Sequence, residues 1–289
     1  MKSIRKLLCT AVFAVALVLP AVATEVKVID ISEPSTTPAP LQTGGALRAH
    51  HVSIMAHRGG RKWAPENTLA SFRKAVEFGC DSIELDIHKC KTGELVVIHD
   101  ADVARTTDGA GAVPDLTLEQ LQKFSAGSRF GAAFADERIP LLADVLKLVD
   151  GKLTVNIEVK NWPRAYPGID DDLIAMLKTY KHPDKIMISS FDHEILSSIH
   201  KKAPQYKLAV LDSAILERPS AYCNEVGARL WHPDFHTLRG DVVERAKQNG
   251  LTVNVWTVNG PAEWTQAINW GVDGICTDDP EGLRAFLSK

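Results

Sequence analysis

Short apolar runs and longer amphipathic runs alternate along the chain from His51 to the C-terminus. Runs rich in β-branched residues favour strands, whereas apolar residues repeated every three to four positions favour helices. The predicted strands cover 52–57, 82–88, 153–160, 186–191, 207–211, 228–232, 251–257 and 273–277. The predicted helices cover 68–78, 141–149, 170–180, 192–201, 241–248 and 262–270. Strands and helices in this alternation are typical of an α/β protein, and eight such strands predict a closed (β/α)8 TIM barrel.

One interruption of this pattern follows the second strand. A turn signal at Lys91-Thr92-Gly93 separates the strand 82–88 from a second β-rich run at 95–100, with no helical pattern between them. This arrangement predicts a β-hairpin. Folding back at the turn places His99 opposite the segment from Glu84 to Asp86 across an antiparallel pair.

Two longer stretches lack the strand and helix pattern. Residues 24–50 contain several prolines and a Gly-Gly pair, a composition that predicts a flexible linker. Residues 101–140 are rich in Gly, Ala, Asp and Ser and carry one helical patch at 116–124. We expect them to form a small insertion, between the second strand and the next helix, that covers the site. The barrel domain then spans 51–289.

The first 23 residues have the pattern of a secretory signal peptide. A basic start is followed by the apolar run 7–19 and by Ala21-Val22-Ala23, a small-x-small cleavage site. The alternative is a membrane anchor, but the apolar run is shorter than the roughly 20 residues that span a bilayer. We therefore expect an exported chain, periplasmic or secreted, with no stable membrane insertion once the signal is removed.

Composition and charge narrow the class of partner. The chain of 289 residues is 45% hydrophobic and 24% charged, which excludes a disordered or collagen-like protein. The net charge of -3 gives no positive field for nucleic acid, so a small-molecule partner is expected. The sequence leaves the oligomeric state open.

The cysteines that follow the signal peptide match no metal-binding spacing. Cys80, Cys90, Cys223 and Cys276 are isolated from one another along the chain. Export to an oxidising compartment allows a disulfide, but isolated cysteines in a large hydrophobic domain are more often unpaired core residues. We expect them to be unpaired.

Three acidic residues interrupt two of the predicted strands. Glu84 and Asp86 stand two apart in the second strand, and Asn156, Glu158 and Lys160 do so in the third, so each set shares one face. Three carboxylates facing one barrel interior would cost several kcal/mol without a cation. Oxygen ligands favour a hard cation such as Mg²⁺ or Ca²⁺. The alternative is a solvated outer face, which the helices of a barrel would cover.

Two histidines and an arginine lie where barrel active sites are built. His57-Arg58-Gly59-Gly60 follows the first strand, at the C-terminal face of the barrel. The glycines allow a ligand to approach the backbone, and the Arg58 guanidinium suits a phosphate. His99 adds a second imidazole. A pair of imidazoles can remove a proton from a nucleophile and give one to a leaving alcohol.

Two further residues have alternative interpretations. Glu66, in Pro65-Glu66-Asn67-Thr68, either hydrogen-bonds substrate or belongs to a simple helix start with Asn67 as the N-cap. Trp256 ends the strand 251–257 and is either a core residue or an apolar wall for substrate. Its place at the C-terminal end of a strand favours the wall.

Together these segments resemble the glycerophosphodiester phosphodiesterase family over residues 52–283. The resemblance rests, in family order, on His57-Arg58-Gly59, Pro65-Glu66-Asn67-Thr68, Glu84-Leu85-Asp86, His99-Asp100, Glu158-Val159-Lys160, Trp256-Thr257-Val258-Asn259 and Gly274-Ile275-Cys276-Thr277-Asp278-Asp279-Pro280. It implies a barrel enzyme that hydrolyses glycerophosphodiesters to sn-glycerol 3-phosphate and an alcohol.

The resemblance also implies roles for residues at the matching positions. The implied metal ligands are Glu84, Asp86 and Glu158, the acid and base are His57 and His99, and the phosphate-binding cations are Arg58 and Lys160. Two other functions remain as alternatives. Phospholipase D-like action on intact lipids needs an apolar rim, and no aromatic or basic cluster stands out. An exported phosphate-binding module without turnover would be indicated by a lost acid or histidine, and none is lost.

Overall fold

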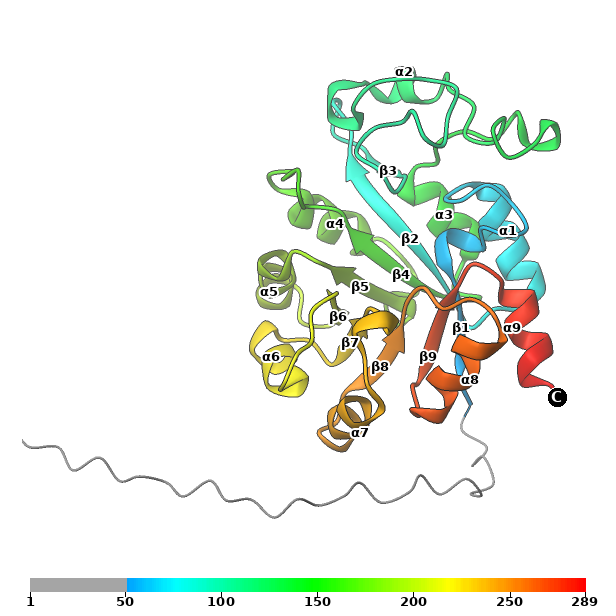
Figure 1. The fold of residues 1–289 in the computed structure, drawn as a ribbon. Helices are drawn as coiled ribbons and strands as arrows, with labels where there is room; N and C mark the ends of the chain where they lie inside the picture. The colour runs from blue at the N-terminus through cyan, green and yellow to red at the C-terminus, as the bar shows by residue number, and fades with distance from the viewer. Residues whose placement is uncertain (1–50) are drawn as a thin grey trace, which may run out of the picture. The chain divides into compact units, whose positions relative to one another are not determined.

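The computed structural model describes residues 51–289. The expected signal peptide and linker, residues 1–23 and 24–50, lie outside the described residues. Eight parallel strands form a sheet that closes because β1 pairs with both β2 and β9 (Figure 1). These strands are β1 (Ser53–Ala56), β2 (Ser82–Lys89), β4 (Thr154–Val159), β5 (Ile186–Ser190), β6 (Lys207–Asp212), β7 (Leu230–Pro233), β8 (Thr252–Val255) and β9 (Gly274–Thr277). The predicted TIM barrel is confirmed.

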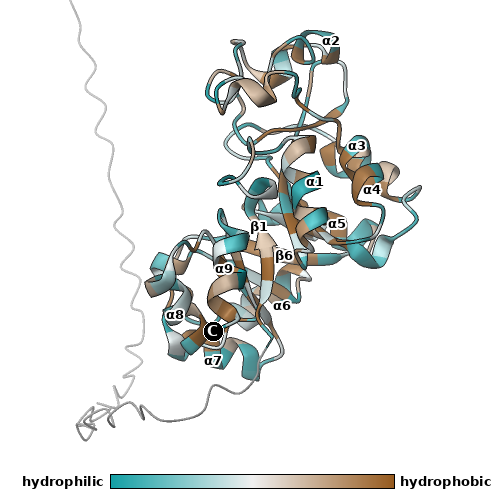
Figure 2. Ribbon diagram, turned by 90° about the vertical axis from the view of Figure 1, so that its right-hand side faces the viewer, coloured by the Kyte–Doolittle hydropathy of each residue, from teal (hydrophilic) through white to brown (hydrophobic). Residues whose placement is uncertain are grey.

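Helices surround the barrel and carry both hydrophobic and hydrophilic positions (Figure 2). They are α1 (Leu69–Phe78), α3 (Leu142–Val149), α4 (Ile169–Leu177), α5 (His193–Lys202), α6 (Pro219–Val226), α7 (Gly240–Gln248), α8 (Pro261–Asn269) and α9 (Pro280–Leu287). The six predicted helices are confirmed, but the sequence pattern does not predict α6 and α9. Both are short, α6 has few apolar residues, and α9 contains a glycine, which weakens helical propensity.

Apolar side chains pack on the two faces of the barrel strands. Residues such as Ile83, Leu85 and Ile87 of β2 join the large core between strands and helices. Met55 of β1 and Cys276 of β9 belong to a separate small cluster. Because successive strand residues point to opposite faces, this second cluster lies inside the barrel, and Glu84 and Asp86, which alternate with the apolar residues of β2, also point there.

The hairpin after β2 is present but shorter than predicted. β3 (Leu95–Val97) pairs antiparallel with β2, and Ile87 lies opposite Val97. One further hydrogen bond, from the Ile98 amide to the Asp86 carbonyl at 3.1 Å, continues this alignment. His99 follows directly, so the fold-back brings it beside the acidic segment of β2, as the pattern predicts.

Residues 101–140 form a lobe beyond the end of β2 and β3 (Figure 1). Its helix α2 (Leu118–Leu121) covers only part of the patch expected at 116–124. The lobe packs on a small core of its own, formed by Cys90, Val96, Ile98, Val103, Val113, Leu121, Ala126 and Ile139. Its attachment to β3 holds it near the barrel mouth.

The four described cysteines are free and buried, which confirms the expectation of unpaired core residues. Within residues 51–289, no helix has both the length and the apolar content that crossing a membrane requires.

Candidate active site

The turn after β1 brings the backbone amide and the guanidinium of Arg58 beside the acidic residues of β2. Arg58 adopts the left-handed region at φ 50°, followed by Gly59 and Gly60 at φ 82° and 97°. A Cβ atom at Gly59 would lie 2.3 Å from the Ser71 Oγ, so only glycine fits there. The Arg58 amide donates to Glu84 Oε2 at 2.8 Å, and its Nε lies 3.5 Å from Asp86 Oδ2. Non-glycine residues in this region are strained and cluster at functional sites.

The three acids of β2 and β4 converge inside the barrel. Asp86 is paired with Glu158 across the two parallel strands, and Glu84 with Asn156, so all four side chains share the inner face. One carboxylate oxygen from each acid lies within 4.8 Å of one from each of the others, and all three residues are buried. The alternative of a solvated outer face is therefore wrong.

Two cations accompany the three carboxylates. Lys160 Nζ lies 2.5 Å from Glu158 Oε1 and 3.1 Å from Asp86 Oδ1. Burial favours the neutral form of Asp86, but the charges of Lys160 and Arg58 outweigh burial and lower the pKa of Asp86. Burial and the neighbouring acids raise the pKa of Glu84 well above its usual range. The two cations therefore do not balance the three acids when all three are ionised.

The donor set fits a hard divalent cation. Asn156 Oδ1 is buried and lacks a hydrogen-bond partner within residues 51–289, and the buried Asp86 Oδ1 has only its ion-pair contact with Lys160, so both oxygens can accept a further contact. Carboxylate and amide oxygens are the ligands that Mg²⁺ and Ca²⁺ prefer. The residues that could hold the ion are Glu84, Asp86 and Glu158.

Each of the two candidate histidines is oriented by a carboxylate. His57 Nδ1 lies 2.7 Å from Asp278 Oδ1, and His99 Nδ1 lies 2.8 Å from Asp100 Oδ1. An ionised carboxylate only accepts hydrogen bonds, so Nδ1 carries the hydrogen of the neutral ring. Neither Nε2 has a hydrogen-bond partner within residues 51–289. Burial lowers the pKa of both imidazoles.

A cavity of about 100 Å³ joins these groups at the barrel mouth. Its charged and ionisable lining comes from His57, Arg58, Glu84, Glu158, Lys160 and His99, and its remaining lining includes Met55, Asn156, Phe191, Leu211, His232, Asn254, Trp256 and Cys276. Trp256 packs edge-to-face on Phe191 with ring centroids 5.5 Å apart. The tryptophan therefore faces the cavity, where the pattern predicts an apolar wall.

His232 is a neutral residue of the cavity lining. Its Nε2 accepts a hydrogen bond from the Asn254 amide at 3.0 Å. Complete burial lowers the pKa of His232 to about 3, so the ring stays uncharged at neutral pH. It contributes a neutral, polar side chain to the cavity wall.

One alternative for the segment from Glu66 to Thr68, with Asn67 as the N-cap, is wrong. Thr68, not Asn67, is the N-cap of α1, and its hydroxyl accepts from the Ser71 amide at 3.3 Å. Asn67 instead has φ 56° and donates from Nδ2 to Asp86 Oδ2 at 2.8 Å. A left-handed Asn lets the chain turn into the helix while its side chain holds a candidate metal ligand. Glu66 contacts arginine side chains.

Several residues of the site carry no functional signal of their own in the sequence. Asp100 and Asp278 stand out only as parts of the family motifs, and Arg61 and Arg105 do not stand out at all. Asp100 could have been suspected because it follows His99 directly. His57 and Asp278 are 221 positions apart, so no local pattern reveals their contact.

Comparison with known proteins assigns the family. The model of the glycerophosphoryl diester phosphodiesterase family matches residues 57–282. A glycerophosphodiester phosphodiesterase of Caldanaerobacter subterraneus subsp. tengcongensis is 44% identical over 82% of this chain and 98% of its own length. One from Bacillus altitudinis is 36% identical over 80% of this chain and 96% of its own length.

Solved structures agree with the sequence comparison. A phosphodiesterase of Oleispira antarctica, solved in complex with the product sn-glycerol-3-phosphate, superposes with a TM-score of 0.76. It is 26% identical, over 82% of this chain and 97% of that one. The family match, over residues 57–282, includes every charged residue of the cavity lining. The chain belongs to the glycerophosphoryl diester phosphodiesterase family of enzymes.

Proposed function

We propose that this enzyme hydrolyses glycerophosphodiesters to sn-glycerol 3-phosphate and an alcohol, with a divalent cation on Glu84, Asp86 and Glu158. One observation carries the proposal: two carboxylate-oriented histidines line the same cavity as Glu84 and Glu158, whose carboxylates cluster with that of the buried Asp86. The Oleispira antarctica relative, whose structure contains sn-glycerol-3-phosphate as product, supports the choice of product. The free Nε2 atoms supply the acid and the base that the reaction needs.

The proposed roles of the cationic residues follow from their positions. Arg58 and Lys160 lie beside the acids and face the cavity, so they can bind the non-bridging oxygens of the phosphodiester. A bound Mg²⁺ or Ca²⁺ would neutralise phosphate charge and polarise the phosphorus for attack. The buried surroundings strengthen each of these interactions relative to water.

The histidines exchange protons with the reacting oxygens. One Nε2 takes a proton from the nucleophile as its oxygen bonds to phosphorus, and the other, in its protonated form, gives a proton to the alkoxide as the second phosphorus–oxygen bond breaks. The nucleophile is either water or the glycerol hydroxyl next to the phosphate, which would give a cyclic phosphate. Water then opens a cyclic product, and the histidines exchange roles in that second step. Following the products with time distinguishes the two routes.

The proposal is tested by release of glycerol 3-phosphate from glycerophosphocholine and glycerophosphoethanolamine. The protein is assayed as prepared, after EDTA, and after addition of Mg²⁺ or Ca²⁺ to the EDTA-treated sample. We expect release that EDTA abolishes and one of the two ions restores. Failure with both substrates, in a folded sample given each ion, would contradict the proposal, and assay of intact phospholipid vesicles would then test phospholipase D-like action.

We also propose that the enzyme acts outside the cytoplasm, periplasmic or secreted. The basic start, the apolar run and the cleavage site within residues 1–23 support export. N-terminal sequencing of the protein recovered from the exported fraction tests this, with cleavage after Ala23 as the expected result. An uncleaved chain that stays in the cytoplasm would contradict it.

A further inference from the structure

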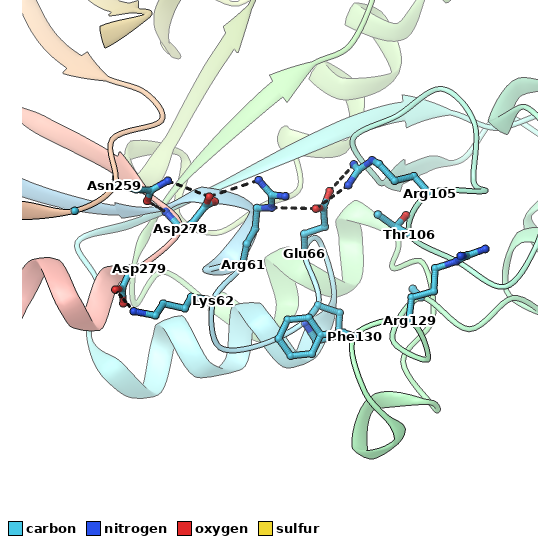
Figure 3. A pocket seen from close by; sticks show the side chains of 13 residues that line it. Arg61, Lys62, Glu66, Arg105, Thr106, Arg129, Phe130, Asn259, Asp278 and Asp279 are labelled. Atoms are coloured by element: carbon cyan, nitrogen blue, oxygen red, sulfur yellow. Dashed lines mark hydrogen bonds and ion pairs between the residues drawn. The ribbon is translucent and has the colours of Figure 1, made fainter. Parts of the chain in front are cut away.

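A second, wider pocket of about 690 Å³ lies beside the catalytic cavity. It is lined by the segment after β1, by the insertion, and by the segments after β8 and β9. Figure 3 shows a row of alternating charges across it, from Asp278 through Arg61 and Glu66 to Arg105. At one end of the row Asp278 contacts His57, and at the other end Arg105 reaches His99 through Asp100.

The row connects His57 to His99 without a gap. Asp278 accepts from His57 and lies 3.5 Å from Arg61 NH1 through its other oxygen. Arg61 Nε in turn lies 3.0 Å from Glu66 Oε2. We call the contacts on both sides of Glu66 the charge chain.

The second half of the charge chain runs from Glu66 into the insertion. Arg105 donates two hydrogen bonds to Glu66, at 2.7 and 3.0 Å, and its Nε donates to Asp100. Asp100 then accepts from His99 at 2.8 Å. Each arginine therefore bridges Glu66 and a carboxylate that orients a catalytic histidine.

Glu66 holds the centre of the charge chain firmly. Its side chain is 9% exposed and contacts three guanidinium groups, those of Arg58, Arg61 and Arg105. Burial favours the neutral acid, but the hydrogen bonds from Arg105 and the charge of Arg58 outweigh it and lower the pKa of Glu66 to about 2. Isolated surface ion pairs contribute little, whereas networks with bidentate arginine contacts hold their geometry better.

The two ends of the charge chain are anchored unequally. Asp278 also accepts from the Asn259 amide at 3.1 Å, so it has a support besides Arg61. Asp100 has no comparable second anchor within residues 51–289, because its side-chain oxygens contact only His99 and Arg105. The orientation of His99 therefore depends more on the charge chain than that of His57 does.

We propose that Arg61 and Arg105 are positioning residues that hold Asp278 and Asp100 through their shared contact with Glu66, and so fix the orientation of both histidine rings. This inference rests on the proposed acid and base roles of His57 and His99. It assigns a function to the insertion, because Arg105 is the insertion's contribution to the chain.

Kinetics of Arg105→Ala and Arg61→Ala test the proposal. We expect kcat to fall about tenfold or more in Arg105→Ala and less in Arg61→Ala, with KM within about twofold of wild type. Arg105→Lys retains one contact and should recover part of the loss. Lys62→Ala is the matched control, because Lys62 lines the same pocket but pairs with Asp279, which is not part of the charge chain. Glu66 is unsuitable for substitution here because it also contacts Arg58.

A spectroscopic readout separates this inference from the proposed activity. Long-range ¹⁵N–¹H NMR reports which ring nitrogen carries the hydrogen, and we expect the Nδ1–H form for His57 and His99 in the wild type. Arg105→Ala should mix the two forms at His99, and Lys62→Ala should leave both rings unchanged. This experiment holds whether or not glycerophosphodiesters are hydrolysed.

Two results would overturn the proposal. Unchanged tautomers in both arginine variants would show that the carboxylates hold the rings without the arginines. A raised KM with normal kcat would instead make Arg61 and Arg105 substrate-binding residues of the wide pocket.

Discussion

The two halves of the barrel mouth differ in chemistry although one repeating fold builds both. On the half formed by β1, β2 and β4, the cavity lining is dominated by charged and ionisable groups. On the half formed by β5 to β9, the lining is neutral and includes Phe191, Leu211, His232, Asn254, Trp256 and Cys276. The first half suits a phosphate and its counter-ions, and the second suits an uncharged organic group.

The difference arises from the strand register. Because Asp86 and Glu158 are paired across neighbouring parallel strands, their carboxylates are close to one another and to Lys160. Buried charges are tolerated only when paired, so concentrating them on adjacent strands lets each cation serve more than one acid. The neutral half carries no such requirement and is free to fit the rest of the substrate.

Removing one carboxylate from the charged half should have the largest effect. Glu158→Gln keeps the shape but removes a candidate ligand, and we expect turnover to fall by about a thousandfold because a metal contributes several kcal/mol to phosphate reactions. Calorimetric titration with Mg²⁺ and Ca²⁺ should show weakened binding. Glu119→Gln, in the exposed part of the insertion, is the control. Unaltered ion affinity in Glu158→Gln would remove the metal site from this half.

Removing either imidazole should cost the next largest amount. We expect His57→Ala and His99→Ala each to lower kcat by about a hundredfold to ten-thousandfold, which is the usual contribution of acid and base groups. His236→Ala serves as the control because its side chain is 64% exposed and lies outside the cavity lining. A variant with near-normal turnover would exclude its histidine from the proton transfers.

The sequence predicts the inward face of the charged half but not its supports. Alternation along a strand is local, so the spacing of Glu84 and Asp86 places both on one face of their strand, and that of Asn156 and Glu158 does the same on the next parallel strand. The hairpin turn likewise predicts where His99 returns. Arg105 cannot be predicted in this way, because its contact with Glu66 joins positions 39 apart through an insertion without regular pattern.

The helices show the same limit. The strongly periodic helices are predicted, whereas α6 lacks enough apolar residues to stand out from a loop. Asn67 is a residue type that favours the N-cap position. Only the structure, with its left-handed backbone at φ 56°, reveals that the Asn67 side-chain amide faces Asp86 instead. Tertiary contacts, and not local propensity, determine the backbone conformation and side-chain partners at such positions.

The free energy of unfolding should depend on pH through Glu66. The pKa of Glu66 is about 2 in the folded protein against 4.5 for the free side chain, so folding favours its ionised form. That stabilisation is complete above about pH 4.5 and is lost as pH falls towards 2. We expect Glu66→Gln to lower the free energy of unfolding by at most about 3 kcal/mol at pH 7, and by less at pH 3. Chemical denaturation at both pH values measures this, and a loss that does not change with pH would indicate packing and not charge.

The neutral half should respond differently, and by the smallest amount. The Trp256 indole donates to the His232 carbonyl at 2.7 Å and packs on Phe191, so its ring faces the cavity as part of a fixed wall. Losing that wall should weaken ground-state and transition-state binding alike, so we expect Trp256→Ala to raise KM about tenfold with kcat nearly unchanged. Trp256→Phe keeps most of the apolar surface and should behave like the wild type. Steady-state kinetics on glycerophosphocholine measures both, and a fall in kcat at constant KM would place Trp256 among the groups that act on the transition state, ending the division between a reacting half and a binding half.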